Sequence, residues 1–189
     1  MNNQEKNYWE NYYKNNLLET PSNFSLFIME YFKSYNNLKI LDCGCGTGRD
    51  TYFFSKKHNI IGIDQSYKPI DKANCKFFIN DFCHYDKSLF DLIYSRFSFH
   101  SITNEQQDIF LKSINKKDTF LCIETRSIKG KTDYRYTGDN HYRNLTDIDY
   151  LKNRLKDNNF EILFIEENKN FAIYKNENPI CIRIICKKL

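Results

Sequence analysis

The chain has 189 residues, with 28 basic and 24 acidic side chains and a formal net charge of +4. This length suits a single domain, here residues 1–189, and leaves no room for a catalytic domain and a full second domain. No run of five or six like charges occurs, so the mild basic excess does not indicate a nucleic-acid surface. The polar, aromatic N-terminus lacks the apolar centre of a signal peptide, and no apolar run reaches the length of a membrane span. We therefore expect a cytoplasmic protein.

The seven cysteines form no C-x-x-C pair. Cys43-x-Cys45 and Cys83-His84 match no standard metal-ligand spacing. We therefore predict free thiols in a reducing compartment and no metal site.

The expected elements alternate along the chain. Pro21 separates two N-terminal helices at 5–17 and 23–35, and Thr20 or Ser22 is the expected cap of the second. Short apolar runs typical of buried parallel strands occur at 39–43, 59–64, 76–80, 90–95, 119–124, 160–165 and 180–186. Further helices are expected at 48–57, 67–74, 104–115 and 146–157. Thr103 or Asn104 is the expected cap of the helix at 104–115, and Thr146 or Asp147 is the expected start of the helix that ends near 157.

This alternation predicts an α/β fold, a Rossmann-like doubly wound sheet with helices on both faces. Residues 1–37 form the N-terminal helices, 38–125 the ligand-binding core and 146–189 a C-terminal helix and hairpin. The polar stretch 126–145 has no clear period, which is typical of a functional loop, and we expect it to cover the substrate. Ligands of such sheets bind at the carboxyl ends of the strands, where strand order reverses.

A glycine-rich turn, Gly44-x-Gly46-x-Gly48, follows the first expected strand. Glycines permit a tight turn and close approach of a ligand to the backbone. The spacing differs from the G-x-G-x-x-G of dinucleotide binders. Asp42 precedes the turn, and its carboxylate would repel a pyrophosphate but accept an ammonium group. S-adenosylmethionine carries an ammonium, a carboxylate and a cationic sulfonium, and it fits this pattern.

Polar residues at the next strand ends extend this interpretation. Asp64 is expected to accept both ribose hydroxyls. Asp81 is expected to accept from the adenine amino group, with Phe82 packed on the ring. Arg49 is expected to pair with the carboxylate of the methionine moiety.

The segments Ile40–Gly48, Ile61–Asp64, Asn80–Phe82 and Phe90–Ser95 resemble motifs I to IV of the class I methyltransferases. The resemblance runs from about residue 8 to the C-terminus, and motif I is its most specific part. It implies a seven-stranded sheet with an antiparallel last strand, S-adenosylmethionine as cofactor and S-adenosylhomocysteine as product. The cofactor contacts assigned on this basis are Tyr13, Asp42, Gly44, Cys45, Gly46, Arg49, Asp50, Asp64, Gln65, Asn80, Asp81, Phe82 and Ser95.

A finer resemblance links four segments to small bacterial methyltransferases found with capsule and surface-polysaccharide genes. These segments are Tyr8–Tyr13, Gly48–Asp50, Glu124–Ser127 and His141–Asn144. In that group Gly-Arg-Asp closes motif I, which implies a cofactor role for Arg49 and Asp50. The group has a second basic residue where this chain has Asn144.

Three residues are candidates for the chemistry: His100, Glu124 and Arg96. His100 suits a general base near neutral pH, with packing on the next helix as the alternative. Glu124 is expected to end the fifth strand, where it orients a base, contacts a sugar hydroxyl or is simply solvated. Methyl transfer is an in-line displacement in which orientation alone supplies roughly 7–11 kcal/mol.

The expected acceptor is a small anion, because guanidinium groups bind phosphate and carboxylate well. Its expected ligands are Arg126, His141, Tyr142 and Arg143, together with Arg96. Ser95-Arg96-Phe97-Ser98 stands where amine methylases of nucleic acids carry Asn-Pro-Pro-Tyr, and no Pro-Cys pair marks a nucleophilic cysteine. Nucleic acid is therefore a disfavoured acceptor.

The resulting hypothesis is methyl transfer to an oxygen of a small metabolite, a sugar, phosphate or phosphoramidate derivative in surface-polysaccharide synthesis, by a monomer or homodimer. Methylation of nitrogen, an RNA or protein acceptor, and a partner subunit without catalytic activity are the alternatives.

Overall fold

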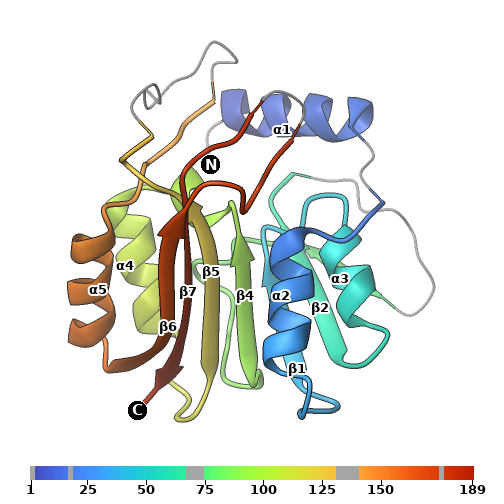
Figure 1. Cartoon of the computed structure of the whole chain (residues 1–189). Helices are drawn as coiled ribbons and strands as arrows, with labels where there is room; N and C mark the ends of the chain where they lie inside the picture. Colours follow the sequence, from blue (N-terminus) through green and yellow to red (C-terminus); the bar gives the residue numbers. More distant parts are fainter. Residues whose placement is uncertain (1–2, 17–18, 67–74, 131–140, 175–176) are drawn as a thin grey trace.

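Seven strands form one mixed sheet in the order β3-β2-β1-β4-β5-β7-β6. A computed structural model describes residues 3–16, 19–66, 75–130, 141–174 and 177–189 (Figure 1). The strands are β1 Lys39–Cys43, β2 Asn59–Asp64, β3 Lys76–Ile79, β4 Leu92–Arg96, β5 Phe120–Arg126, β6 Phe160–Asn168 and β7 Cys181–Lys188. The strands β1 to β5 pair in parallel, and β7 runs antiparallel to both of its neighbours. This confirms the expected Rossmann-like sheet with an antiparallel last strand.

Helices cover both faces of the sheet. They are α1 Asn3–Asn15, α2 Asn23–Tyr31, α3 Arg49–Phe54, α4 Asn104–Ser113 and α5 Ile148–Asp157, with a 3-10 turn at Phe99–Ser101. Successive strand residues point to opposite faces. Leu41 therefore packs in a core that includes buried residues of α4 and α5, while Ile40 packs in a second core with α2 and α3.

Three helices begin at residues that the sequence indicates. Ser22 accepts from the backbone of Ser25 at the start of α2, and Asp147 accepts from the backbone N–H groups of Asp149 and Tyr150 in α5. Thr103 forms a reciprocal capping box with Gln106 at the start of α4. The helix expected at 67–74 lies outside the described residues.

Strand β5 is longer than expected and changes the setting of Glu124. The antiparallel strand β7 continues the ladder by pairing Thr125 with Ile182 and Arg126 with Cys181. The prediction that Glu124 ends the strand is therefore wrong, because the ladder continues for two more residues.

Helix α1 lies across the end of the sheet at which the parallel strands finish (Figure 1). The same end receives the connection between β6 and β7 and the described parts of the segment expected as a lid, 126–130 and 141–145. That segment leaves β5 and returns beside it, where Ser127 bridges to Thr146. The rest of the expected lid, 131–140, lies outside the described residues. Within the described ranges, no helix combines the length and the apolar character needed to cross a membrane.

Candidate functional site

A cavity of about 480 Å³ opens at the carboxyl ends of β1, β2 and β4, under α1 and the β6–β7 connection. This volume is in the range of small-molecule sites. Most of the predicted site residues line it, namely Tyr13, Asp42, Gly44, Cys45, Gly46, Arg49, Asp50, Asp64, Gln65, Phe82, Arg96, His100, Arg126, His141 and Arg143. Five predicted residues are not part of its lining: Asn80, Asp81, Ser95, Glu124 and Tyr142.

The glycine-rich turn forms one wall of the cavity. Gly44 and Gly46 have φ angles of 76° and 53°, in the left-handed region that disfavours side chains. A Cβ on Gly44 would lie 2.5 Å from the Cβ of Ser98, and one on Gly46 would lie 2.9 Å from the Tyr13 ring. The turn is therefore packed between β4 and α1 with no space for side chains.

Two carboxyl groups stand at the ends of β1 and β2. Asp42 is 2% exposed, and its Oδ2 accepts from the Thr51 hydroxyl at 2.6 Å. Its Oδ1 accepts no hydrogen bond from the described part of the chain. Burial raises the pKa of Asp42 to about 8 and also raises the pKa of Asp64. The Asp64 carboxylate accepts from the Gly46 N–H at 2.9 Å, so it braces the turn as well as facing the cavity.

The turn after β3 places Asp81 outside the cavity. Asp81 accepts from the Cys83 N–H at 2.9 Å and contacts the His84 Nδ1 at 3.1 Å, so its carboxylate closes the turn. Asn80 is exposed, and its side chain accepts from the Asp81 N–H. Phe82, the next residue, is the part of this segment that reaches the cavity.

Ser95 supports the site from behind. Its hydroxyl shares a 2.7 Å hydrogen bond with that of Ser98, which donates to the Cys43 carbonyl at 2.6 Å. These contacts hold the ends of β1 and β4 together behind the glycine turn.

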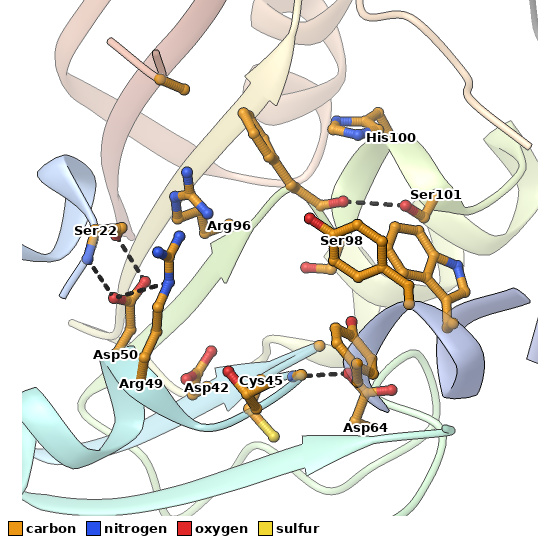
Figure 2. A pocket seen from close by; sticks show the side chains of 18 of the residues that line it. Ser22, Asp42, Cys45, Arg49, Asp50, Asp64, Arg96, Ser98, His100 and Ser101 are labelled. Atoms are coloured by element: carbon orange, nitrogen blue, oxygen red, sulfur yellow. Dashed lines mark hydrogen bonds and ion pairs between the residues drawn. The ribbon is translucent and has the colours of Figure 1, made fainter. Parts of the chain in front are cut away.

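Asp50 fixes the start of α3 to the start of α2. It accepts from the Ser22 N–H and hydroxyl, each at 2.7 Å, from Ser25 at 3.0 Å and from Tyr94 at 2.8 Å. These donors occupy both of its oxygens. Asp50 therefore contributes to the site mainly by positioning its neighbour Arg49, whose Nε lies 4.0 Å from its carboxylate (Figure 2).

Glu124 is held between two guanidinium groups. Arg96 donates to it from Nε at 3.0 Å and Arg183 of β7 donates at 2.7 Å, and its side chain is fully buried. Burial raises the pKa of Glu124, and the two cations oppose this rise. The expected solvated or substrate-contacting carboxylate is thus a structural anion that orients Arg96. The terminal nitrogens of Arg96 donate to no described residue, and the side chain lines the cavity.

His100 presents one nitrogen to the protein. Its Nδ1 accepts from the Arg126 N–H at 3.2 Å and lies 3.3 Å from the Thr125 hydroxyl. Burial and the charges of Arg126 and Arg143 lower its pKa well below the usual value. The ring is therefore neutral, and because Nδ1 is an acceptor, its proton is on Nε2.

The other predicted acceptor ligands lie near the rim. Arg126 pairs with Glu177 of the β6–β7 connection at 2.5 Å, and Arg143 is buried in the cavity wall. The His141 ring stacks on Tyr8 of α1 at 4.4 Å. Tyr142 instead donates its backbone N–H to Glu5, which ties this segment to α1.

Several parts of the cavity lining were not predicted as site residues, and two of them carry aromatic side chains. One is the rest of the aromatic face of α1, Tyr8, Trp9 and Tyr12, and the other is the β6–β7 connection with Phe171 and Tyr174. The dense aromatic run before Lys14 was a usable signal for α1. The connection carries no motif, and only the pairing of β6 with β7 places it at the cavity.

Cys45 also lines the cavity, while Cys43 lies in the core beneath it. Across the described ranges, no three His, Cys, Asp or Glu side chains cluster in a way that suits a metal ion.

Residues 40–117, from β1 to just beyond α4, match the family model described as a methyltransferase domain. This segment is similar to a methyltransferase domain over 78 of the chain's 189 residues. It supplies the glycine turn, Asp64, Arg96 and His100, while α1, Arg126, Arg143 and the β6–β7 connection lie outside the matched range. None of the curated protein sequences matches the chain.

Solved structures share the fold of this segment and its flanking elements at low sequence identity. One is the Burkholderia thailandensis 1,6-didemethyltoxoflavin-N1-methyltransferase with its acceptor and S-adenosylhomocysteine bound (TM-score 0.68, 16% identity, 87% of this chain and 76% of that chain). Another is an S-adenosylmethionine-dependent methyltransferase from Anabaena variabilis (TM-score 0.72, 18% identity, 97% of this chain and 95% of that chain). A third is the [4+2]-cyclase SpnF (TM-score 0.68, 15% identity, 87% of this chain and 79% of that chain). These likenesses establish the fold, and the cyclase illustrates that one fold hosts different reactions.

Proposed function

We propose that the chain is an S-adenosylmethionine-dependent methyltransferase that methylates an oxygen of a small anionic metabolite. One observation carries the proposal: a single cavity has carboxyl groups on one side and guanidinium groups on the other. Asp42 and Asp64 lie along the glycine turn, and Arg49 and Arg96 lie beside each other above them (Figure 2). The carboxyl groups suit the cationic part of the cofactor, while Arg49 suits the carboxylate of its methionine moiety and Arg96 suits an anionic acceptor.

The carboxyl side fits the cofactor. The Oδ1 of Asp42 is available to an ammonium group, and Asp64 stands where a ribose would bind at the end of β2. Arg49 is placed by Asp50 to receive the carboxylate of the methionine moiety. Gly46 also lines the cavity, and the Tyr13 ring packs against it. The cofactor supplies an activated methyl group, so the protein's task is to hold the acceptor in line with it.

The cavity favours a small acceptor. Helix α1 and the β6–β7 connection both contribute to its walls, so RNA or a folded protein has little access to the glycine turn. The resemblance to methyltransferases of capsule gene clusters supports a sugar or phosphorylated sugar made for a surface polymer as the acceptor.

A second candidate is methylation of nitrogen. It is favoured by the fold shared with the Burkholderia thailandensis enzyme, which is named as an N1-methyltransferase of 1,6-didemethyltoxoflavin. An isolated product whose new methyl group is bonded to nitrogen decides for this candidate.

Calorimetry with S-adenosylhomocysteine tests the cofactor assignment. We expect binding by the full chain and at least a tenfold loss in Asp64→Ala, with no change in the exposed control Asp157→Ala. Asp81→Ala tests the adenine contact separately, and unchanged affinity assigns Asp81 to the turn alone. Absence of binding by the unaltered chain refutes the proposed function.

A further inference from the structure

We propose that the reacting group of the acceptor is already an oxyanion, a carboxylate or phosphate oxygen, and that His100 binds it as an N–H donor instead of removing a proton. This inference rests on the proposed function and goes further by naming the chemical class of the nucleophile. It predicts that the product is a methyl ester of a carboxylic or phosphoric acid.

The backbone determines which nitrogen of His100 carries the proton. A backbone N–H can only donate, and the Arg126 N–H is directed at the His100 Nδ1 at 3.2 Å. The neutral ring therefore has its proton on Nε2. No described residue hydrogen-bonds to Nε2, and His100 is one of the residues that line the cavity.

The cations around His100 keep it neutral and favour an anion beside it. The charged and titratable groups that act on its ring are Arg126, Arg143, His141 and Arg96. The Phe97 ring lies among several of these groups, with the Arg96 Cζ 4.5 Å and the Arg126 Cζ 5.7 Å from its centroid. The His100 ring centre lies 5.2 Å from the same ring. An oxyanion at Nε2 therefore gains a hydrogen bond within a cationic wall, whereas a proton taken up by the ring would be repelled.

The nearby carboxylates are committed to other partners. Glu124 is shared between Arg96 and Arg183, and Glu177 pairs with Arg126. Asp50 accepts four hydrogen bonds from the protein. An acceptor alcohol would need a base to lose its proton, but a carboxylate or phosphate monoanion needs none.

The reaction balances without proton transfer. A lone pair on the acceptor oxyanion forms the new O–C bond to the methyl group, and the electron pair of the S–C bond stays on sulfur. One anion and one sulfonium cation become a neutral ester linkage and a neutral thioether. His100 keeps its Nε2 proton throughout.

Product chemistry provides the first test. The full chain is incubated with methyl-labelled S-adenosylmethionine and the small-molecule fraction of source cells. We expect alkali to release labelled methanol from a carboxyl ester, or the label to reside in a phosphate methyl ester identified by phosphorus NMR. Label in an alkali-stable product that is not a phosphate methyl ester, such as an ether or an N-methyl compound, overturns the inference while leaving the proposed function intact.

Nitrogen NMR of the histidine side chains tests the same inference without any acceptor, with His100→Gln used to assign the signal. We expect His100 to carry its proton on Nε2 and not to titrate between pH 5.5 and 8. We also expect inorganic phosphate, added to the S-adenosylhomocysteine complex, to shift the Nε2–H signal. Titration near pH 6.5, or a proton on Nδ1, refutes the donor role.

A rate measurement separates His100 from His141 once a labelled product is in hand. His100→Gln places an amide N–H near the position of Nε2, so we expect this variant to retain more activity than His100→Ala. We also expect the rate of methyl transfer to be constant between pH 6 and 8 in both the His100→Gln variant and the unaltered chain. A sigmoid pH profile that disappears in His141→Gln identifies His141 as a base and overturns the inference.

Discussion

Asp42→Asn is expected to stabilise the protein and to weaken cofactor binding at the same time. The Asp42 carboxyl is buried at the end of β1, and its pKa in the folded chain is about 8 against 3.8 for the free group. Between these two pH values the unfolded chain ionises this group more readily than the folded chain does. The stability associated with the neutral carboxyl is therefore fully present below about pH 4 and is lost as the pH rises to about 8.

The magnitude follows from the difference in pKa. Each pKa unit corresponds to about 1.4 kcal/mol, so at pH 7 the ionisable carboxyl costs on the order of 4 kcal/mol relative to a neutral side chain of the same shape. Asparagine retains an oxygen that accepts from Thr51. For a domain of this size, that gain corresponds to a rise in Tm of roughly 10 °C.

Thermal unfolding of both proteins from pH 4 to pH 8.5, monitored by circular dichroism, measures the effect. The advantage of Asp42→Asn should be near zero at pH 4, grow with pH and level off above pH 8. Asp91→Asn is the matched control. Partial burial raises the pKa of Asp91, but hydrogen bonds from Lys116 and the Lys39 N–H lower it below the usual value, so this variant should lose stability at neutral pH.

Calorimetry at pH 7 completes this test. The cofactor's ammonium group requires ionised Asp42, so S-adenosylhomocysteine should release a proton on binding and should bind Asp42→Asn at least tenfold more weakly. A difference in Tm that does not vary with pH refutes the reasoning about burial. Unchanged affinity refutes the ammonium contact.

Two further substitutions test the packing of the site. Glu124→Gln should lower the free energy of unfolding by roughly 3–5 kcal/mol, because two buried guanidinium groups lose their shared anion; urea unfolding measures this, with the exposed Glu161→Gln as control. A loss below 1 kcal/mol would show that solvent compensates these cations. Gly44→Ala should cost at least about 1–3 kcal/mol, since it combines a left-handed φ with a Cβ placed 2.5 Å from that of Ser98. Stability unchanged by the alanine would mean that β4 moves away from the turn without cost.

The sequence pattern predicted the sheet and its carboxyl-end site because each depends on local signals. Apolar runs that stop at polar residues define β1, β2 and β4, and the glycine turn follows directly from its spacing. The expected roles of Asp42, Asp64 and Arg49 depend on this same edge of the sheet. All three side chains line the cavity.

The departures from the expected site come from contacts that the pattern of single elements does not reveal. Glu124 was assigned to a strand end because its neighbours in sequence do not reveal that β7 extends the ladder of β5 and brings Arg183 beside it. The turn after β3 closes on Asp81 through local hydrogen bonds, and Asp81 is not part of the cavity lining. The role of His100 stays a prediction, and the sequence did not reveal the hydrogen bond from the Arg126 backbone, a contact formed only when β5 packs beside the 3-10 turn.

The position of β7 between β5 and β6 has a consequence for biosynthesis. The ribosome makes β7 after every other described strand, yet Arg183 on β7 holds both Glu124 and the Phe171 carbonyl of the connection above the cavity. Until β7 joins the sheet, Glu124, which orients Arg96, lacks its second cation, Arg183, and the connection that forms part of the cavity wall is not held in place. A chain that ends before β7 therefore lacks one of the two cations that hold Glu124 and the contact that fixes Phe171 above the cavity.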